Sequence, residues 1–320
     1  MEHASPFDDA LADLRVSGSV LVHETYAAPW AIRIPPQDVL RSMLGVGAST
    51  RVMPFHLVLD GAFELTQGRM SPLAVTAREV AICPDGAEHL MSSGRVRRAT
   101  PFAEIMAAVR PDAQAITATG PRTTLLCGVF LLANAPLNPL LGSLPPVLKV
   151  QTAGNRDSPQ LVHAADMLAL EVARGSRGSF TASRLLEVFC AEAIAGYRRG
   201  AGAERPGWFM GLADPKIGRA LEQLHRDPGR PWSVEALAAT VTMSPSRFAA
   251  RCRETTGESV MAYVARWRMN TACRQLHETD DGLAEISQRV GYTDVAAFSR
   301  AFKALVGESP SQWRTRTSKR

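Results

Sequence analysis

Short runs of alternating apolar and polar residues occupy the first part of the chain, from about Val16 to Ala135. They read SVLVHETY, AIRI, FHLVLDGAFELT, EVAICPDGAEHLM and TTLLCGVFLL, with Gly, Pro and Asp between them. The Asp-Gly pairs in LDGAF and CPDGAEH are typical of tight turns between antiparallel strands, because glycine adopts a positive φ without steric cost. The pattern predicts an antiparallel β-barrel or sandwich.

A helical period replaces the alternation after the Pro-rich segment NAPLNPLLGSLPPVL. Two amphipathic helices are expected before the linker RRGAGAERPG. Their apolar stripes are Leu161, Ala165, Leu168 and Val172, then Leu186, Phe189, Cys190, Ala193, Ile194 and Tyr197. The pair either caps the barrel or forms a dimer interface. We favour a part in dimerisation, because a hairpin between two domains has few other surfaces on which to bury both stripes.

The chain from Asp214 onward has the pattern of an all-helical region with explicit helix starts. Asp214-Pro215, Ser244-Pro245 and Ser309-Pro310 each place a side-chain acceptor at an N-cap. Each also places a proline in the first turn, where its missing N–H costs nothing. Helices are therefore expected to begin at these three pairs.

An internal repeat lies in this helical region. RFAARCRETTGESVMAYVARWR (247–268) aligns with AFSRAFKALVGESPSQWRTR (297–316), with Phe248 on Phe298. Upstream, VEALAATVTMS aligns with LAEISQRVGYT once the second copy has one extra turn residue. Each copy has a short apolar helix, a tight turn and a second helix with an inward apolar pair at i and i+4. Each copy is therefore a predicted helix-turn-helix unit.

The two units resemble the DNA-binding domain of the AraC/XylS family of transcription regulators over about Asp214 to Arg316. The segment RVGYTDVAAFSRAFKALVGESPSQWR is similar to the family's second helix-turn-helix and its signature almost position by position. The resemblance implies that the long helix SVMAYVARWRMNTACRQL (259–276) is a rigid connector. It would space the two recognition helices about one DNA turn apart on one face.

Family contacts can be carried over to the exposed positions of both recognition helices. They fall on Ser246, Arg247, Ala249 and Ala250, and on Val295, Ala296, Ser299 and Arg300. Alanine and valine can meet a thymine methyl but make no bidentate hydrogen bonds, so base readout is expected to depend on the two arginines and two serines. Arg251, Arg253 and Lys303 are expected to be phosphate clamps or solvated surface. Cys252, where the family usually has an aromatic residue, and Cys273 are expected to be buried structural thiols.

Charge and composition agree with a nucleic-acid partner. Residues 215–320 hold 17 Lys and Arg against 11 Asp and Glu, whereas the rest of the chain holds 19 against 20. Such an asymmetry suits a polyanion but also a solvated surface. The acidic N-terminus has no signal-peptide pattern, no stretch is apolar enough for a membrane span, and the five cysteines form no CxxC pair. A cytoplasmic protein with reduced thiols and no membrane partner is therefore expected.

The N-terminal β segment resembles the cupin-type sensor domain of one branch of the AraC/XylS family, in FHLVLDGAFEL, REVAICPDGAEHLM and LLCGVFLL. It departs from the metal-dependent cupin enzymes, whose first motif has two histidines and a glutamate, so no enzyme activity is expected. His56, His89 and Cys127 are instead candidate ligands of a zinc-like transition metal, or a redox-responsive set. The alternative is ordinary packing. Trp30, Arg33 and Phe55 are candidate lining residues of a pocket for a small organic effector.

The predicted architecture is α+β and multidomain. A cupin-like antiparallel β-barrel (1–150) would act as the sensor, a two-helix segment (151–207) as linker and dimer interface, and an all-α domain with two helix-turn-helix units (208–320) would bind DNA. The expected function is a homodimeric transcription regulator that binds promoter DNA specifically and responds to a small molecule, a metal or a redox signal. RNA polymerase would be a further partner if the protein is an activator. An interaction protein is the alternative class.

Overall fold

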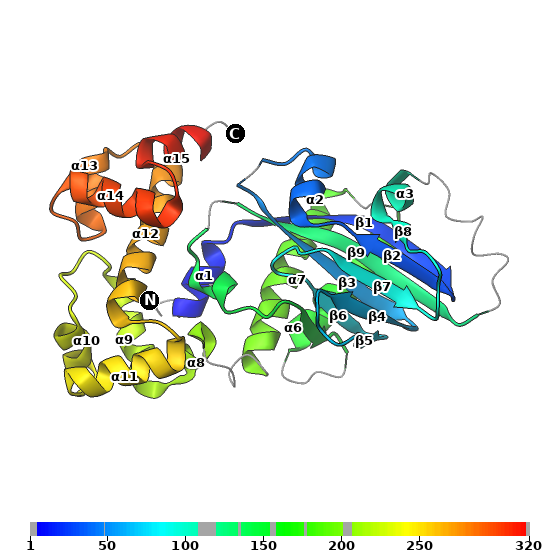
Figure 1. Cartoon of the computed structure of the whole chain (residues 1–320), viewed down its shortest axis with the longest axis horizontal. Helices are drawn as coiled ribbons and strands as arrows, with labels where there is room; N and C mark the ends of the chain where they lie inside the picture. The colour runs from blue at the N-terminus through cyan, green and yellow to red at the C-terminus, as the bar shows by residue number, and fades with distance from the viewer. Residues whose placement is uncertain are drawn as a thin grey trace. The chain divides into compact units, whose positions relative to one another are not determined.

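The computed structural model describes residues 5–47, 49–107, 120–133, 136–153, 158–175, 178–200 and 207–317 (Figure 1). Contacts within the chain define two compact units. The β-rich unit comprises Val16–Ala133 and Leu144–Arg199, and the helical unit comprises Met1–Arg15, Asn134–Ser143 and Gly200–Arg320. The backbone therefore passes between the two units four times.

The β-rich unit contains two five-stranded sheets, as the alternating pattern predicts. One has the order β1 (Val16–Ala27), β9 (Arg122–Leu132), β3 (Arg51–Asp60), β6 (Glu79–Ile82) and β10 (Leu148–Gln151). The other has the order β5 (Leu73–Thr76), β4 (Ala62–Gln67), β7 (His89–Ser93), β2 (Trp30–Ile34) and β8 (Thr100–Pro101). Neighbouring strands are antiparallel except β2 and β8, which are parallel.

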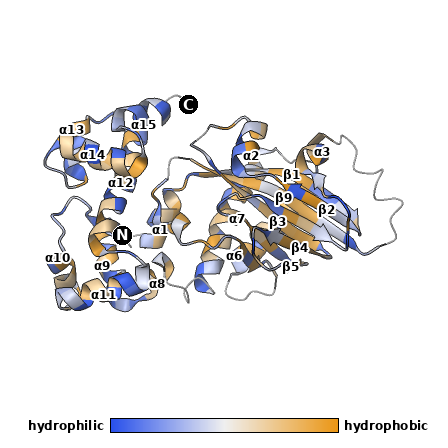
Figure 2. Cartoon of the chain, viewed as in Figure 1, coloured by the Kyte–Doolittle hydropathy of each residue, from blue (hydrophilic) through white to orange (hydrophobic). Residues whose placement is uncertain are grey.

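Strand β3 shows how the pleat separates two sets of core residues. Phe55 is fully buried and stacks on Phe130 of β9, with ring centroids 4.6 Å apart. The next residue, His56, points to the opposite face, as side chains alternate along a strand. That face belongs to a core containing residues of both sheets, such as Val58, Cys127 and Met91. Strands β3 and β9 are buried on both faces over most of their length, and Figure 2 shows hydrophobic residues along this part of the sheet.

Helices α6 (Pro159–Ala173) and α7 (Phe180–Arg199) form a hairpin, and α7 packs on the first sheet. Phe189 of α7 lies 5.9 Å from Phe55 between ring centroids. Gly18 of β1 allows this approach, because a Cβ there would lie 3.2 Å from Leu186 Cδ1. All of the residues predicted for the two apolar stripes are buried. The inner face of the hairpin therefore caps a sheet. The described part of this unit also contains two shorter helices, α2 (Gln37–Leu44) and α3 (Phe102–Ala107).

The helical unit contains both predicted helix-turn-helix units. Helices α10 (Val234–Thr240) and α11 (Pro245–Thr256) form the first, and α13 (Leu283–Arg289) and α14 (Val295–Val306) form the second. The long helix α12 (Val260–Glu278) joins them. The remaining helices are α1 (Pro6–Ala12), α5 (Pro139–Gly142), α8 (Trp208–Ala213), α9 (Pro215–Arg226) and α15 (Pro310–Thr317).

All three helix starts predicted from Asp-Pro and Ser-Pro pairs are observed, but only two have the expected cap. Asp214 accepts hydrogen bonds from the amides of Lys216 and Ile217 at the start of α9. Ser309 accepts from the amide of Gln312 in α15. The Ser244 side chain makes no cap hydrogen bond, so that part of the prediction is wrong. Proline alone marks the start of α11.

The contact-based units differ from the predicted domain boundaries at the chain start. Residues up to Arg15 belong to the helical unit and not to the β-rich sensor. Residues 134–143 also belong to the helical unit, and helices α6 and α7 belong to the β-rich one. Among the described residues, no helix is long and apolar enough to cross a bilayer.

Two glycines with left-handed φ allow a test of the packing around the turn of the second helix-turn-helix. Gly291 in its turn has φ +83°, and a Cβ there would lie 2.6 Å from the Arg268 guanidinium and 2.9 Å from the Gly229 carbonyl oxygen. Arg268 cannot retreat freely, because it donates to the carbonyls of Pro228 and Arg230. Gly257 has φ +81° and open space around it.

We expect Gly291→Ala to destabilise the protein by about 2–3 kcal/mol and Gly257→Ala by about 1 kcal/mol, because both alanines must adopt a strained left-handed φ but only the one at position 291 also clashes with its neighbours. Thermal and urea unfolding of the full chain would measure the difference. Equal losses in both variants would contradict the packing around Gly291.

Candidate DNA-binding surface and sensor site

The first predicted recognition helix, α11, presents its predicted contact residues outward. Ser246, Arg247, Ala250 and Arg253 are exposed and Ala249 is partly exposed. Phe248 and Cys252 form the inward pair and are both 1% exposed. The Cys252 thiol lies 3.7 Å from the Thr256 hydroxyl. The helix therefore has one buried apolar face and one face of arginines, serine and alanines.

Helix α14 repeats this arrangement. Val295, Ala296, Arg300 and Lys303 are exposed and Ser299 is partly exposed, whereas Phe298 and Phe302 are fully buried. Asp294 caps the helix by accepting from the amides of Ala296 and Ala297. These backbone donors hold the pKa of Asp294 below its usual value. The capping carboxylate thus stays negative beside the exposed arginine of the same helix.

The arginines of these two helices differ in the partners that they have. Arg251 donates to the buried side chain of Asp214 at 2.5 Å and ties α11 to the start of α9. Arg300 lies 4.0 Å from Asp294, a contact between two exposed side chains that contributes little. Within the described part of the chain, Arg247, Arg253 and Lys303 make no ion pair. Arg251 is therefore structural, and the others have guanidinium or ammonium donors to offer.

The internal repeat extends to side-chain interactions that the sequence comparison missed. Glu258 pairs with Arg266 in the first copy, and Glu308 pairs with Arg316 at 2.6 Å in the second, at the same offset as Phe248 and Phe298. Each arginine also lies over the aromatic ring of its copy, Tyr263 or Trp313. The repeated Glu-Ser and Arg positions could have shown this pair in the sequence. The duplication therefore includes the ion pair and the arginine–ring contact that follow each recognition helix.

A network of aromatic side chains packs the first helix-turn-helix. The Tyr263 hydroxyl accepts from Trp208 Nε1 at 2.7 Å and lies 2.7 Å from His225 Nε2. The His225 ring stacks on Trp267 with centroids 3.5 Å apart. Burial lowers the pKa of His225 to about 3, so the ring is neutral at physiological pH. These rings provide the aromatic packing that Cys252 does not supply.

The second helix-turn-helix has its own core around the C-terminal half of α12, where Cys273 is fully buried. Trp313 Nε1 donates to the Cys273 carbonyl at 3.1 Å. Burial raises the pKa of both Cys252 and Cys273, so both are thiols. The prediction that these two cysteines are buried is confirmed.

The N-terminal helix α1 is an element that the sequence analysis did not identify. A capping box between Ser5 and Asp8 begins it, and this Ser-Pro-x-Asp pattern was the available signal. Its C-cap residue Asp13 accepts from Asn270 Nδ2 at 2.8 Å and pairs with Arg274 at 2.6 Å. Burial raises the pKa of Asp13, and the partners Arg274 and Asn270 limit that rise. The start of the chain is thereby attached to the connector helix.

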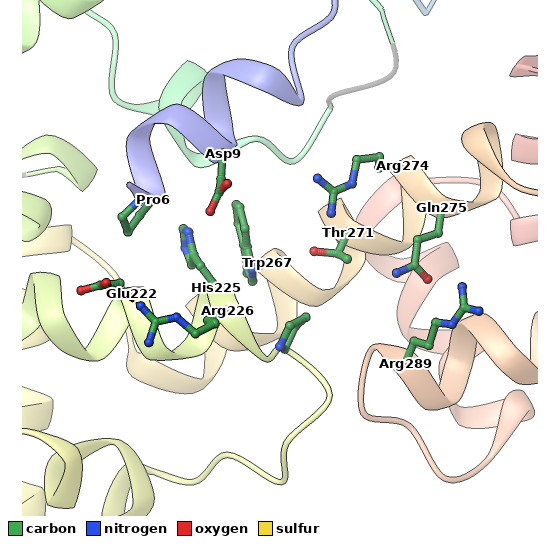
Figure 3. A pocket seen from close by; sticks show the side chains of 11 residues that line it. Pro6, Asp9, Glu222, His225, Arg226, Trp267, Thr271, Arg274, Gln275 and Arg289 are labelled. Carbon is green, nitrogen blue, oxygen red and sulfur yellow. Dashed lines mark hydrogen bonds and ion pairs between the residues drawn. The ribbon is translucent and has the colours of Figure 1, made fainter. Parts of the chain in front are cut away.

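A cleft of about 470 Å³ lies beside this attachment within the helical unit (Figure 3). Asp9 of α1 points toward His225 and Trp267, and Arg289 of α13 lies near Gln275 of α12. Arg226 and Arg289 pair with carboxylates of their own helices, Glu222 and Glu285. The arginine charges in the cleft are thus already compensated by the protein.

In the β-rich unit the structure brings two of the three predicted metal ligands together and replaces the third. His56 Nε2 and His89 Nε2 are 2.8 Å apart, from β3 of one sheet and β7 of the other. The third residue with a ligand atom within 4.8 Å of both is Cys83, which directly follows β6. Cys127 lies beside His56 in the strand register but is not in this group. It lines a small apolar cavity with residues such as Val22 and Met91.

Both imidazoles are 2% exposed and burial lowers their pKa values, so both are neutral. His89 Nδ1 lies 2.9 Å from the Ala87 carbonyl, which can only accept, so the proton of His89 is on Nδ1. Its Nε2 then carries a lone pair aimed at His56. Burial also raises the pKa of the Cys83 and Cys127 thiols. Without a cation nearby, neither cysteine is a reactive thiolate.

The three residues proposed to line an effector pocket contact different parts of the described β-rich unit. Arg33 is half exposed and pairs with Glu88 at 2.8 Å on the surface. Phe55 packs toward α7, as described above, and Trp30 packs between Tyr26 and Phe63. The sequence could have shown that Phe55 does not face the same core as His56, because neighbouring side chains of a strand point to opposite faces.

Comparison with known proteins follows this division of the chain. A model of the Cupin family matches residues 5–196, and a model described as a helix-turn-helix domain matches residues 237–316. An AraC-like transcription regulator of Streptomyces antibioticus is 34% identical over 204 residues, covering 63% of this chain and 67% of that protein. A second, from Streptomyces lividans, is 28% identical over 311 residues, with 97% of each chain covered.

The HTH-type transcriptional regulator AlkR of Acinetobacter baylyi is 24% identical over 309 residues, covering 94% of this chain and 96% of that protein. Among solved structures, the C-terminal domain of AraT from Geobacillus stearothermophilus is 29% identical, covers 32% of this chain and 86% of that one, and has a TM-score of 0.32.

A β-rich cupin unit joined to tandem helix-turn-helix units defines a DNA-binding transcription regulator and not an enzyme. The chain belongs to the AraC family of transcription regulators, with an N-terminal cupin domain and a C-terminal helix-turn-helix domain.

Removal of the Asp13 carboxylate tests the attachment of α1. We expect Asp13→Ala to destabilise the helical unit by about 1–2 kcal/mol, because Asn270 loses its acceptor and the half-exposed Arg274 loses its partner. Asp13→Asn should cost less, since the amide keeps an acceptor and the buried charge is gone. Urea unfolding of the full chain, with limited proteolysis of its first residues, measures both. An Asp13→Ala protein as stable and protease-resistant as the wild type would contradict the attachment.

Proposed function

We propose that this regulator binds specific promoter sequences as a homodimer, with α11 and α14 contacting base edges, and that its cupin unit controls this binding in response to a signal. The observation that carries the proposal is the duplicated helix with one buried and one exposed face, in which each exposed face holds an arginine and a serine. Arg247 and Ser246 would contact bases from the first copy, and Arg300 and Ser299 from the second.

The neighbouring side chains have separate roles in this proposal. Ala249, Ala250, Val295 and Ala296 allow close approach and meet thymine methyl groups. Arg253 and Lys303, exposed and without an ion pair among the described residues, lie at the ends of the two faces and would clamp phosphates. Phosphate contacts of this kind fix the position of the protein on DNA and contribute most of its sequence-independent affinity.

A map of the genomic fragments bound by the purified protein at a stated salt concentration tests the proposal. We expect discrete sites, with Arg300→Ala weakening binding to them by about tenfold or more, since one bidentate arginine–guanine contact contributes about 1–3 kcal/mol. Arg122→Ala is the matched control, because it removes the same charge from an exposed position on β9 of the other unit.

Loss of the sites in Arg300→Ala, but not in Arg122→Ala, would support specific readout by α14. Diffuse, salt-sensitive binding that is equal in all three proteins would contradict it. The helical repeats would then be better explained as a surface for another protein.

The proposed dimer rests on the outer side of the α6–α7 hairpin. Met167 and Leu170 on α6 are 54% and 63% exposed, and Phe180 and Val188 on α7 are 79% and 50% exposed. Their inner neighbours are already buried against the sheets, so packing among the described residues of this unit does not cover these four. Large apolar side chains exposed together on one hairpin are typical of an association surface. A second copy of the hairpin would cover them with matching chemistry.

Sedimentation of the full chain measures this association. We expect a dimer for the wild type and a monomer for Leu170→Glu and Phe180→Glu, because a charge in the interface would be desolvated. Met43→Glu on α2, where the methionine is 41% exposed, is the control and should remain a dimer. A monomeric wild type, or dimers of both hairpin variants, would contradict the assignment of this surface.

The proposed signal at the cupin unit is a small molecule, a metal or a redox change. The apolar cavity lined by Cys127 has a volume of only about 10 Å³, enough for about one water molecule. An organic effector would have to rearrange that part of the core. The burial of the cysteines, in turn, disfavours the thiolate that oxidants attack.

A further inference from the structure

We propose that His56, Cys83 and His89 bind one zinc-type cation that links the two sheets of the cupin unit, and that occupancy of this site is the signal to the DNA-binding unit. The binding part stands on the geometry alone, and the regulatory part rests on the proposed function. The cysteine differs from the one that the sequence indicated, because Cys83 and not Cys127 completes the group.

The ligand atoms already lie close together in the buried core. The two Nε2 atoms are 2.8 Å apart, and the ligand atom of each of the three residues lies within 4.8 Å of the other two. Tetrahedral zinc, with Zn–N bonds of about 2.0–2.1 Å, places two nitrogen ligands about 3.3 Å apart. Binding would therefore require the rings to separate by only about half an ångström.

The hydrogen bonds of the two imidazoles direct both Nε2 atoms to one point, where a cation could bind. The Nδ1–H group of His89 donates to the Ala87 carbonyl, the kind of hydrogen bond that usually orients a metal-binding histidine. His56 Nδ1 is buried and has no hydrogen-bond partner. Because His89 Nε2 carries a lone pair, His56 Nε2 donates to it in the metal-free protein. No hydrogen bond at Nδ1 opposes a change of tautomer, so the proton of His56 can move to Nδ1 when Nε2 binds a cation.

The ligand set selects the class of cation. Two neutral imidazoles and one thiolate suit zinc and related borderline metals, and do not suit magnesium or calcium, which take oxygen ligands. On binding, the Cys83 thiol releases its proton to solvent as the sulfur–metal bond forms, so the desolvation that opposes a bare thiolate is overcome by the charge of the cation. Three protein ligands leave the fourth position for water or for an exchangeable group.

The backbone around the ligands is fixed, which favours a preformed site. The Cys83 amide donates to the Pro54 carbonyl beside His56, at 2.8 Å. The loop to His89 turns at Gly86, where φ is +60° and a Cβ would lie 2.4 Å from a β3 carbonyl. Gln37 of α2 holds the same loop through its amide and its side chain. A cation here would join three rigid segments of the fold.

The first experiment measures metal in the full chain without any DNA. We expect one zinc per chain by elemental analysis in the wild type and in Cys127→Ser, and at least tenfold less in Cys83→Ser and His89→Gln. After chelator treatment, Co²⁺ should produce a thiolate-to-cobalt charge-transfer band in the wild type and Cys127→Ser only. Because the ligand variants could fail to fold, their circular dichroism and the effect of Zn²⁺ on the melting temperature of the chelated wild type are measured as well.

The outcomes separate the two parts of the proposal. A wild type that neither retains zinc nor melts higher with Zn²⁺ or Co²⁺ overturns the site, and so does a folded Cys83→Ser protein that binds metal normally. A site that depends on Cys127 instead overturns the assignment of Cys83. For regulation, we expect DNA affinity at a mapped site to differ at least fivefold between metal-free and zinc-loaded protein.

If zinc binds but the metal-free and the zinc-loaded protein have equal DNA affinities, the regulatory part of the proposal is overturned. The metal would then be structural only. Failure of the DNA-binding proposal is distinguishable, because it shows as the absence of discrete sites at any zinc content.

Discussion

The helical unit depends on one element, the connector helix α12, which is buried in two cores at once. Tyr263 and Trp267 in its first half belong to the packing of the first helix-turn-helix, and Cys273 and Leu276 in its second half belong to the core of the second. A helix of 19 residues is about 28 Å long and turns by a fixed angle per residue. The two sets of buried residues therefore fix both the separation and the rotation of the two recognition helices. No flexible linker intervenes between them.

The same helix is also where the start of the chain is attached, through Asp13, Asn270 and Arg274. The cupin family match begins at residue 5 and so includes α1, although α1 packs within the helical unit. Strand β1 begins at Val16, immediately after this attached segment, and pairs with β9 through Val22 and Cys127. A change in the cupin unit thus has a short covalent route to α12. Such a change matters only if it favours one arrangement of the DNA-binding unit over another.

Much of this fold could be predicted from the sequence, because its repeats and periodicities are local. Seven of the strands described (β1 to β4, β6, β7 and β9), the two amphipathic helices and the duplicated helix-turn-helix follow from spacing. The short strands β5, β8 and β10 do not. The partner of His56 and His89 could not be found that way, because Cys83 reaches His56 only through the pairing of β6 with β3. His89 joins them through the turn at Gly86 and the packing of the two sheets. The attachment of Asp13 joins residues more than 250 positions apart. Contacts at that separation leave no periodic trace in one sequence.

The composition of the recognition faces gives a physical reason for a dimer. One chain offers two arginines for bidentate readout, and each such contact contributes about 1–3 kcal/mol of discrimination. Specific DNA-binding proteins discriminate against other sites by about 4–10 kcal/mol. Arg247 and Arg300 of one chain therefore reach only the lower part of that range, since their neighbours are alanine and valine. In the proposed dimer a second copy would double the direct readout, so the exposed hairpin of α6 and α7 and the sparse recognition faces would have one common explanation.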